Sequence, residues 1–180
     1  VVGFGGEATS RIVKDRAKIV WQHELKGTGH AVLQTSPILE KKKGCTIILC
    51  GDTPLLTSNT ISDLYKKHEK FGNDLTILTS YVENSKGYGR IVREYKTNHI
   101  LGIREEKDCN EEEKDIHEIN AGVYVVDNTL LFKYLSRITP NNMQSEYYLT
   151  DIVSMFVKDG LKVDSYVLED AEEIYGINDR

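Results

Sequence analysis

Apolar and polar positions along this chain form two kinds of block. Short apolar runs rich in β-branched residues predict strands, and apolar residues three and four positions apart predict helices. The clearest strand is the run Ile-Ile-Leu-Cys at residues 47–50, which stops at Gly51 and Asp52 and is typical of a buried, central strand of a parallel sheet. The clearest helix begins after Thr57, where a threonine or serine hydroxyl can cap the first turn.

The same rules place the remaining elements. Further strands are predicted at residues 18–22, 75–82, 119–126 and 163–168, and two short strands at 90–94 and 99–105 are predicted to form a hairpin. Further helices are predicted at residues 7–14, from Thr28 onward with Thr28 as the cap, at 131–138 and at 149–160. Residues 108–115 are dense in charge and predict a solvated loop or a short helix.

Strands that alternate with helices indicate an α/β fold. We expect a mixed, mainly parallel sheet with helices on both faces and a small antiparallel insertion around residues 89–126. Because no internal repeat or long linker divides the chain, residues 1–180 are expected to form one domain.

Composition narrows the range of functions. The chain has 180 residues and a formal net charge of −5, which argues against a protein that holds nucleic acid by bulk electrostatics. Its three cysteines, Cys45, Cys50 and Cys109, form no paired motif and favour reduced thiols in the cytoplasm. No apolar stretch reaches the length that a membrane-spanning helix needs, so no membrane partner is expected.

Candidate chemistry gathers where predicted strands end, which is where open α/β sheets bind ligands. Asp52 follows the clearest strand, and Gly51 beside it lets the backbone approach a phosphate closely, so the pair suits a divalent cation. Gln22 follows another strand, and its amide can donate to and accept from the edge of a base. Gly27 and Thr28 begin a helix whose backbone N–H groups suit an anion.

Three further residues suit a neutral ligand rich in hydroxyl groups. Gly89 lies in a glycine-rich turn, Glu105 ends one strand of the hairpin, and Asn120 lies near the start of the next strand. Asn178, near the end of the chain, could add an oxygen ligand to a cation held by Asp52. Taken singly, each of these residues is better explained as part of an ordinary turn or strand end.

Taken together, the motifs resemble the uridylyltransferase domain of the bacterial bifunctional UDP-N-acetylglucosamine pyrophosphorylase/glucosamine-1-phosphate N-acetyltransferase family. Motifs in the family's order extend over essentially the whole chain: Gln22 with Gly27–Ala31, Gly51–Leu55, Gly87–Arg93, Glu118–Asn120, Glu146–Asp151 and Gly176–Arg180. The resemblance implies a Rossmann-like nucleotidyltransferase fold of the kind that binds nucleotide-diphospho-sugars.

The resemblance also implies a reaction, in which UTP and N-acetylglucosamine 1-phosphate give UDP-N-acetylglucosamine and pyrophosphate for peptidoglycan synthesis in the cell wall. It assigns the uridine nucleotide to Gln22, Gly27, Thr28, Cys50, Gly51 and Asp52. It assigns the N-acetylglucosamine part to Gly89, Glu105 and Asn120, and a Mg²⁺ cofactor to Asp52 and Asn178. It assigns no catalytic residue to this chain.

Two parts of the family pattern are not found in the sequence. The family begins with a strand and a G-x-G-T-R-M loop that holds the triphosphate, and it ends with a β-helix that carries acetyltransferase activity and forms trimers. We therefore expect a domain that is incomplete at its N-terminus, monomeric, and of little or no pyrophosphorylase activity alone. Ala121 also stands where the family more often has threonine.

Two other functions stay open at the level of sequence. The chain could be a nucleotidyltransferase for another sugar 1-phosphate or base, because the sugar assignment depends on Glu105 and Asn120. It could also be a non-catalytic domain, derived from such an enzyme, that binds nucleotide sugars.

Overall fold

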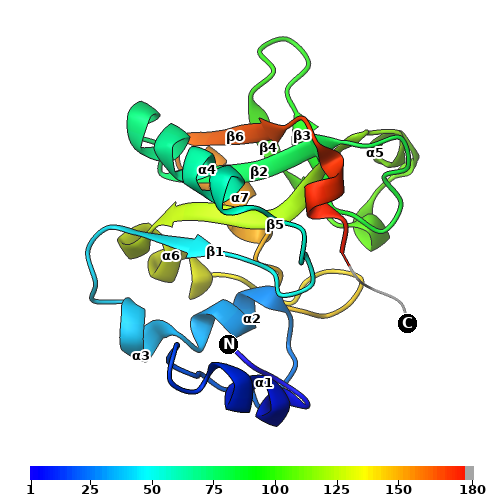
Figure 1. The fold of residues 1–180 in the computed structure, drawn as a ribbon. Coiled ribbons are helices and arrows are strands. Elements are labelled where there is room, and N and C mark those ends of the chain that lie inside the picture. Colours follow the sequence, from blue (N-terminus) through cyan, green and yellow to red (C-terminus); the bar gives the residue numbers. More distant parts are fainter. Residues whose placement is uncertain (177–180) are drawn as a thin grey trace. The chain divides into compact units, whose positions relative to one another are not determined.

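Strand β5 is the longest strand, and the other strands are arranged around it. The structure is a computed structural model that describes residues 1–176. In a six-stranded sheet, β4, β3, β5, β2 and β6 follow one another in this order, and β1 also pairs with β5 (Figure 1). The strands are β1 (Cys45–Ile48), β2 (Leu75–Tyr81), β3 (Arg90–Arg93), β4 (Ile100–Arg104), β5 (Glu118–Asp127) and β6 (Val163–Leu168). The α-helices are α1 (Gly6–Val13), α2 (Thr28–Leu33), α3 (Ser36–Leu39), α4 (Ser58–Phe71), α5 (Glu111–Lys114), α6 (Asn128–Leu135) and α7 (Asp151–Lys158), and the 3-10 helices are η1 (Glu106–Asp108) and η2 (Ala171–Ile174).

The chain divides into two compact units. The first contains Val1–Gly44 and Asn128–Ile152, and the second contains Cys45–Asp127 and the chain from Val153 onward. Helices α1, α2, α3 and α6 belong to the first unit, and all the strands of the sheet belong to the second.

One edge of β5 is shared by two strands, while β2 pairs along its other edge. On the shared edge, β1 pairs with Tyr124–Asp127, and β3 pairs with Ile119. The pairing on this edge is therefore interrupted in the middle of β5.

The register of β2 against β5 shifts at the same place. Ile77 lies opposite Tyr124, but Thr79 lies opposite Asn120, so two positions along β2 match four along β5. The additional residues form a bulge, in which Gly122 has a φ of 72°. Bulges of this kind bend a strand and redirect its side chains.

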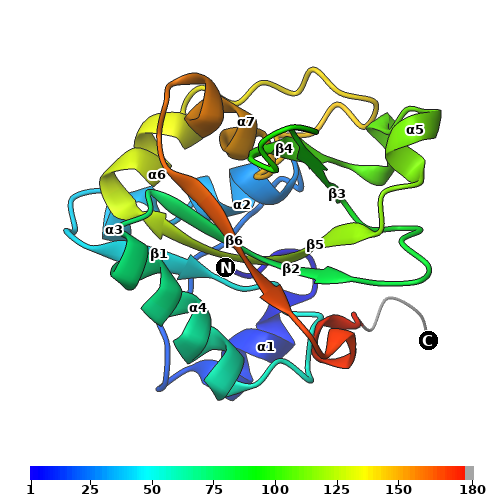
Figure 2. The same ribbon diagram turned by 90° about the horizontal axis from the view of Figure 1, so that it is seen from above.

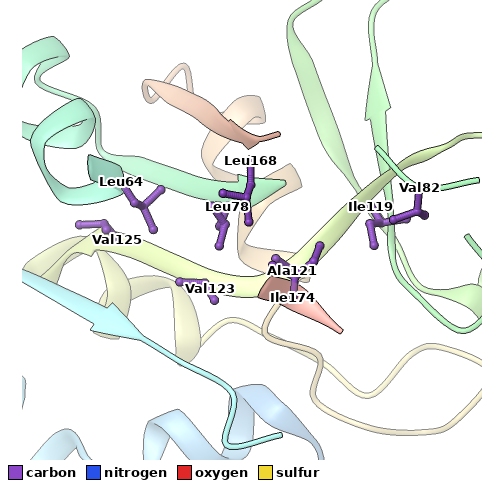
Figure 3. Close-up of a cluster of buried hydrophobic side chains, with 9 residues drawn as sticks. All are labelled: Leu64, Leu78, Val82, Ile119, Ala121, Val123, Val125, Leu168 and Ile174. Atoms are coloured by element: carbon purple, nitrogen blue, oxygen red, sulfur yellow. The ribbon is translucent and has the colours of Figure 1, made fainter. Parts of the chain in front are cut away.

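A hydrophobic cluster packs the sheet against α4 (Figure 3). Its buried members come from α4, β2, β5, β6 and η2 and the adjoining loop: Leu64, Leu78, Val82, Ile119, Ala121, Val123, Val125, Leu168 and Ile174. The part of α7 in the second unit lies on the opposite face of the sheet from α4 (Figure 2), and its Val153 and Phe156 are fully buried. Burying each large aliphatic or aromatic side chain contributes about 1.5–3 kcal/mol.

A polar network centred on Glu118 ties four strands of the second unit together. Arg93 of β3 donates to both carboxylate oxygens of Glu118 at 2.6 and 2.7 Å. Glu118 also accepts from the hydroxyls of Thr79 and Tyr81 on β2, and Arg93 donates to Ser165 Oγ on β6. Because Glu118 is 3% exposed, its charge is stabilised by these partners rather than by water.

The fold class and most of the predicted elements are confirmed. The sheet is mixed, it has helices on both faces, and the predicted hairpin is the antiparallel pair β3–β4. The hydroxyl of Thr57 accepts from the Thr60 N–H at 3.2 Å and so caps α4 as expected. The charged segment forms the short helix α5, which is capped by Asn110.

The balance of parallel and antiparallel pairs differs from the expectation of a mainly parallel sheet. Among the strands described within residues 1–176, β2–β6 is the one parallel pair, and the other pairs are antiparallel. Alternation of strands and helices predicts parallel pairing only where a helix separates strands that become neighbours. Here β5 pairs with three strands that it does not follow through such a crossover.

Two predicted strands differ from the structure. β1 ends at Ile48, and within the described residues it pairs along one edge only, with β5, so Ile47 and Leu49 are 38% and 47% exposed. An apolar run indicates a strand but not how many neighbours the strand has. The strand predicted at residues 18–22 is reduced to one parallel bridge between Trp21 and Val2.

Within residues 1–176, no helix combines the length and the apolar character needed to cross a membrane.

Replacement of Glu118 tests how much the polar network contributes to the free energy of unfolding. We expect Glu118→Gln to lower the free energy of unfolding by about 3 kcal/mol, because it leaves the charge of Arg93 without its buried counter-ion. Glu111→Gln, which removes an exposed partner of Lys114, is the matched control and should change it by less than about 0.5 kcal/mol. Urea denaturation measures both values, and equal losses would contradict a special role for Glu118.

Candidate functional site

Gln22 is held in the first unit by two contacts of its amide nitrogen. Gln22 Nε2 donates to the carbonyl of Gly27 at 3.1 Å and lies 3.0 Å from Nδ1 of His30. The residue is 8% exposed, so these contacts fix its orientation. The sequence indicates that this amide can both donate and accept hydrogen bonds, but in the structure its nitrogen already contacts Gly27 and His30. The acceptor Oε1 is the group that remains for a ligand.

The turn at Gly27 is packed against a second segment of the first unit. Gly27 has a φ of 102°, and a Cβ at this position would lie 2.7 Å from the carbonyl oxygen of Tyr147. The Tyr147 N–H donates to Lys26 O at 2.8 Å, and the Gly29 N–H donates to Tyr147 O at 2.8 Å. Glycine is therefore required at residue 27 by both conformation and space.

Thr28 does not cap α2, so that prediction is wrong. Gly27 occupies the N-cap position, and Thr28 is the first residue of the helix. The Thr28 hydroxyl instead accepts from the Leu149 N–H at 3.0 Å. It thereby satisfies a backbone donor of the neighbouring segment rather than one of its own helix.

In the second unit, the chain after β1 turns at Gly51. Nothing lies within 4 Å of the Cβ that a side chain at Gly51 would add, and its φ is outside the left-handed region. The protein's own packing therefore does not require glycine here. Gly51 and Asp52 are both exposed.

Cys50 connects this turn to the bulge of β5. The residue is exposed as a whole, but its thiol donates to the carbonyl of Gly122 at 3.3 Å. A Cβ at Gly122 would lie 2.7 Å from Cys50 Sγ, so the two segments are in close contact. Burial of the sulfur, and then the carboxylates of Asp52 and Glu105, raise the pKa of the Cys50 thiol above its ordinary value. The thiol therefore stays protonated at neutral pH.

The side chain of Asn120 is fixed at the bulge. Its Nδ2 donates to the hydroxyl of Tyr124 at 2.6 Å, and its Oδ1 accepts from the Gly122 N–H at 3.0 Å. Its backbone N–H donates to the carbonyl of Gly89 at 2.8 Å, which brings the glycine-rich turn before β3 to the same place.

Gly89 is in contact with both of the other residues predicted to hold a sugar. A Cβ at Gly89 would lie 3.0 Å from Cγ2 of Ile103, 3.4 Å from Oε2 of Glu105 and 3.6 Å from Cβ of Asn120. The structure therefore brings Gly89, Glu105 and Asn120 together at the interrupted edge of β5.

An ion pair connects the two segments that carry Gly89 and Glu105. Arg90 is 2% exposed, and its Nη2 lies 2.7 Å from Oε2 of Glu106. Arg90 Nη1 also donates to the carbonyl of Tyr88. Burial alone would raise the pKa of Glu106, but a hydrogen bond from the Gly87 backbone and the Arg90 guanidinium lower it on balance.

The predicted site residues therefore form two groups, each within one unit. Gln22, Gly27 and Thr28 are gathered in the first unit. Cys50, Gly51, Asp52, Gly89, Glu105 and Asn120 belong to the second, where Cys50 and the Gly89 group contact the bulge of β5.

Of the two residues predicted to bind Mg²⁺, the structure describes Asp52, whereas Asn178 lies outside residues 1–176. Within those residues, no cluster of three or more histidine, cysteine, aspartate or glutamate side chains could hold a metal ion. Mg²⁺ is often bound by one or two carboxylates together with substrate phosphates and water, so a single exposed carboxylate at Asp52 fits its usual ligand set.

Two residues of this site are missing from the sequence-based set. Tyr124 contacts Asn120 through its hydroxyl, and Gly122 contacts both Asn120 and Cys50. A glycine inside a predicted strand is a signal of a bulge, and it could have indicated Gly122. Tyr124 has the appearance of an ordinary buried strand residue, and nothing in the sequence distinguishes it.

Comparisons with known proteins agree on one family and one fold. The family model described as nucleotidyl transferase matches residues 9–172. The protein named Bifunctional protein GlmU from Heliobacterium modesticaldum is 47% identical over 180 residues, which is 100% of this chain and 39% of that protein. The protein of the same name from Geobacillus thermodenitrificans is 43% identical over 180 residues, again 100% of this chain and 39% of that protein.

Among solved structures, UDP-glucose pyrophosphorylase complexed with UDP-glucose matches with a TM-score of 0.65 and 19% identity, over 92% of this chain and 63% of that chain. At this level of identity the match shows the fold. The chain spans about 39% of the length of the curated relatives that it matches.

Gly27 and Gly44 offer a matched test of the turn in the first unit, because both have a φ of 102°. Of these two glycines, Gly27 has neighbours within 4 Å of an added Cβ and Gly44 has none. We expect Gly44→Ala to lower the free energy of unfolding by about 1 kcal/mol through backbone strain alone. Gly27→Ala should cost about 1–3 kcal/mol more, because the methyl group meets the Tyr147 backbone. Urea denaturation provides the comparison, and equal losses would refute the close approach.

Proposed function

Because this chain belongs to the nucleotidyl transferase family, we propose that it is a uridylyltransferase that forms UDP-N-acetylglucosamine and pyrophosphate from UTP and N-acetylglucosamine 1-phosphate. The family match and the curated relatives confirm the resemblance found in the sequence motifs. The reaction and its substrates are the part that we propose.

The observation that carries the proposal is the group of polar residues at the interrupted edge of β5. There Glu105 supplies a carboxylate, Asn120 a fixed amide, and Gly89 a backbone position that has no side chain of its own and lies close to both. A few fixed polar groups of this kind suit a neutral sugar, whose hydroxyl and acetamido groups each need a donor or an acceptor. We assign the N-acetylglucosamine part to these residues.

We assign the uridine nucleotide to two segments. Gln22 presents Oε1, which can accept the N–H of a uracil ring, and the backbone at Gly27 and Thr28 lies beside it through the Gln22–Gly27 hydrogen bond. Gly51 provides open space at which a phosphate can approach the backbone, next to Cys50.

Mg²⁺ would be held by the carboxylate of Asp52, with Asn178 proposed as a second oxygen ligand. When bound, the ion supplies charge neutralisation and a template for the phosphate oxygens. Asp52 contributes a negative charge that is free to approach the ion because the residue is exposed.

In this reaction the main task of the chain is to position the two substrates. The nucleophile is a phosphate oxygen of the sugar 1-phosphate, which is already ionised near neutral pH because the second pKa of a phosphate monoester is about 6. The oxygen attacks the α-phosphorus of UTP and pyrophosphate leaves, so no protein group has to remove a proton. Orienting the two substrates in line supplies much of the rate enhancement in reactions of this type.

The chain spans 39% of the length of its curated relative, and the same resemblance supports the proposal that it belongs to a larger protein. We propose that it acts in the cytoplasm on a peptidoglycan precursor, and that it carries an acetyltransferase part and forms trimers. The expectation of little or no turnover by this chain alone stays a prediction.

Ligand binding tests the proposed function directly in this chain. Calorimetry with UDP-N-acetylglucosamine, UDP-glucose and dTDP-glucose, each with Mg²⁺, should give the tightest binding for UDP-N-acetylglucosamine. Tighter binding of either other ligand would favour another sugar or base. No binding of any of the three would contradict the proposal, and release of pyrophosphate from UTP measures turnover separately.

Gly51→Ala should separate ligand binding from stability. The added methyl group lies in open space, so the free energy of unfolding should change by less than about 0.5 kcal/mol. The binding constant for UDP-N-acetylglucosamine should weaken by about tenfold or more, because the methyl group occupies the position proposed for the phosphate. Lys96→Ala, in the exposed turn before β4, is the control for binding. Unchanged affinity in Gly51→Ala would remove Gly51 from the site.

Asp52→Asn tests the proposed metal ligand with a readout other than activity. Mn²⁺ in place of Mg²⁺ enhances the relaxation of water protons when it binds, and this enhancement can be titrated in the presence of UDP-N-acetylglucosamine. Loss of the carboxylate should weaken Mn²⁺ binding by about tenfold, since an amide oxygen is a weaker ligand for a hard cation. Asp63→Asn on α4 is the matched control, and equal effects of the two variants would refute the assignment.

A further inference from the structure

We propose that Tyr124 is a positioning residue for the sugar, because its buried hydroxyl fixes the amide of Asn120 in one orientation. This inference rests on the proposed function, in which Asn120 holds the sugar part of the ligand. It adds a residue that the sequence motifs do not indicate.

The orientation of the Asn120 amide follows from its two partners. The Gly122 N–H can only donate, so the group that faces it at 3.0 Å must be the oxygen Oδ1. The nitrogen Nδ2 then faces the hydroxyl of Tyr124 at 2.6 Å and donates to it. If the amide were reversed, its N–H groups would face the N–H of Gly122, which is unfavourable.

These contacts leave a defined set of groups for a ligand. Nδ2 of Asn120 has two hydrogens and donates one of them to Tyr124. Oδ1 has two lone pairs and uses one of them for the Gly122 N–H. One donor and one acceptor therefore remain, in fixed directions, for a sugar substituent that offers an acceptor and a donor.

Tyr124 is suited to this part because its phenol is kept neutral and immobile. The residue is 3% exposed and lies in β5, where it pairs with Ile48 of β1 and Ile77 of β2. Burial, together with the nearby carboxylate of Glu105, raises the pKa of the Tyr124 hydroxyl far above its ordinary value. The hydroxyl therefore stays protonated at neutral pH and accepts the hydrogen bond from Asn120.

The bulge in β5 is what allows the two side chains to meet. Asn120 and Tyr124 are four residues apart, and in a regular strand such residues would be separated by about 13 Å. The two additional residues that β5 has between Asn120 and Tyr124, opposite Ile77 and Thr79 of β2, shorten this span, so that Tyr124 reaches back to Asn120. Gly122, with a φ of 72°, provides the N–H that completes the arrangement.

A fixed amide has a consequence for selectivity. An amide that rotates freely can satisfy a hydroxyl or an acetamido group by turning over, whereas a fixed amide favours ligands whose donor and acceptor match its own. Binding to a pre-oriented group also avoids the entropy of ordering it. Removing the hydroxyl of Tyr124 should therefore weaken binding of the sugar part and leave binding of the nucleotide part unchanged.

Tyr124→Phe removes the hydroxyl and keeps the ring, so it tests the hydrogen bond apart from packing. We expect the dissociation constant for UDP-N-acetylglucosamine to rise about 5-fold, which corresponds to one neutral hydrogen bond. The dissociation constant for UDP should not change, and the preference for UDP-N-acetylglucosamine over UDP-glucose should narrow. Tyr166→Phe, on β6 and partly buried, is the control and should change neither constant.

The outcomes separate this inference from the proposed function. If the unaltered chain binds UDP-N-acetylglucosamine and Tyr124→Phe binds it equally well, or loses affinity for UDP to the same extent, the inference is wrong and the proposed function stands. If the unaltered chain does not bind it, the proposed function fails.

A second measurement decides the role of Tyr124 even if the variant does not fold. In NMR spectra of the unaltered, isotope-labelled chain, the side-chain NH₂ of Asn120 should show a cross-peak to the Tyr124 ring and slowed exchange with water. An Asn120 amide that exchanges as fast as that of the exposed Asn98, and shows no such cross-peak, would overturn the inference.

Discussion

The second unit depends on one constraint, which is that β5 pairs with β2 on one edge and with two different neighbours, β1 and β3, on the other. β1 takes the part of the shared edge that ends at Asp127, and β3 takes the part near Ile119. Between them the register shifts, and the strand forms a bulge at Gly122. The polar residues of the candidate site gather at this interruption, because there the side chains and backbone of β5 are not covered by a neighbouring strand.

The two halves of β5 are held in place by different interactions. On the side of Ile119, the bidentate pair of Glu118 and Arg93 connects β5 to β2, β3 and β6 in a buried network. Along the rest of the strand, apolar side chains such as Val123 and Val125 pack against α4 (Figure 3). The site therefore lies between the Glu118 network and the hydrophobic cluster. Interactions on both sides of the site hold the backbone that carries its residues.

The sequence predicted the elements well because periodicity and capping are local properties. The cap at Thr57 and the charged helix before β5 follow from residues within one turn of each other. The partners of β1, the bulge and the contact between Asn120 and Tyr124 depend on which strands meet, and a run of apolar residues carries no information about that. The same reasoning explains why Thr28 was expected to cap its own helix, although it bonds to a segment more than one hundred residues away.

The interrupted edge of β5 is proposed to bind the sugar part of UDP-N-acetylglucosamine. The most direct test is an NMR titration of the isotope-labelled chain with UDP-N-acetylglucosamine, followed through the backbone amide signals. We expect saturable shifts at Gly89, Glu105, Asn120 and Gly122 that are much smaller when UDP is the ligand. Saturable binding with no shift at these residues, or equal shifts with UDP, would contradict sugar binding at this edge.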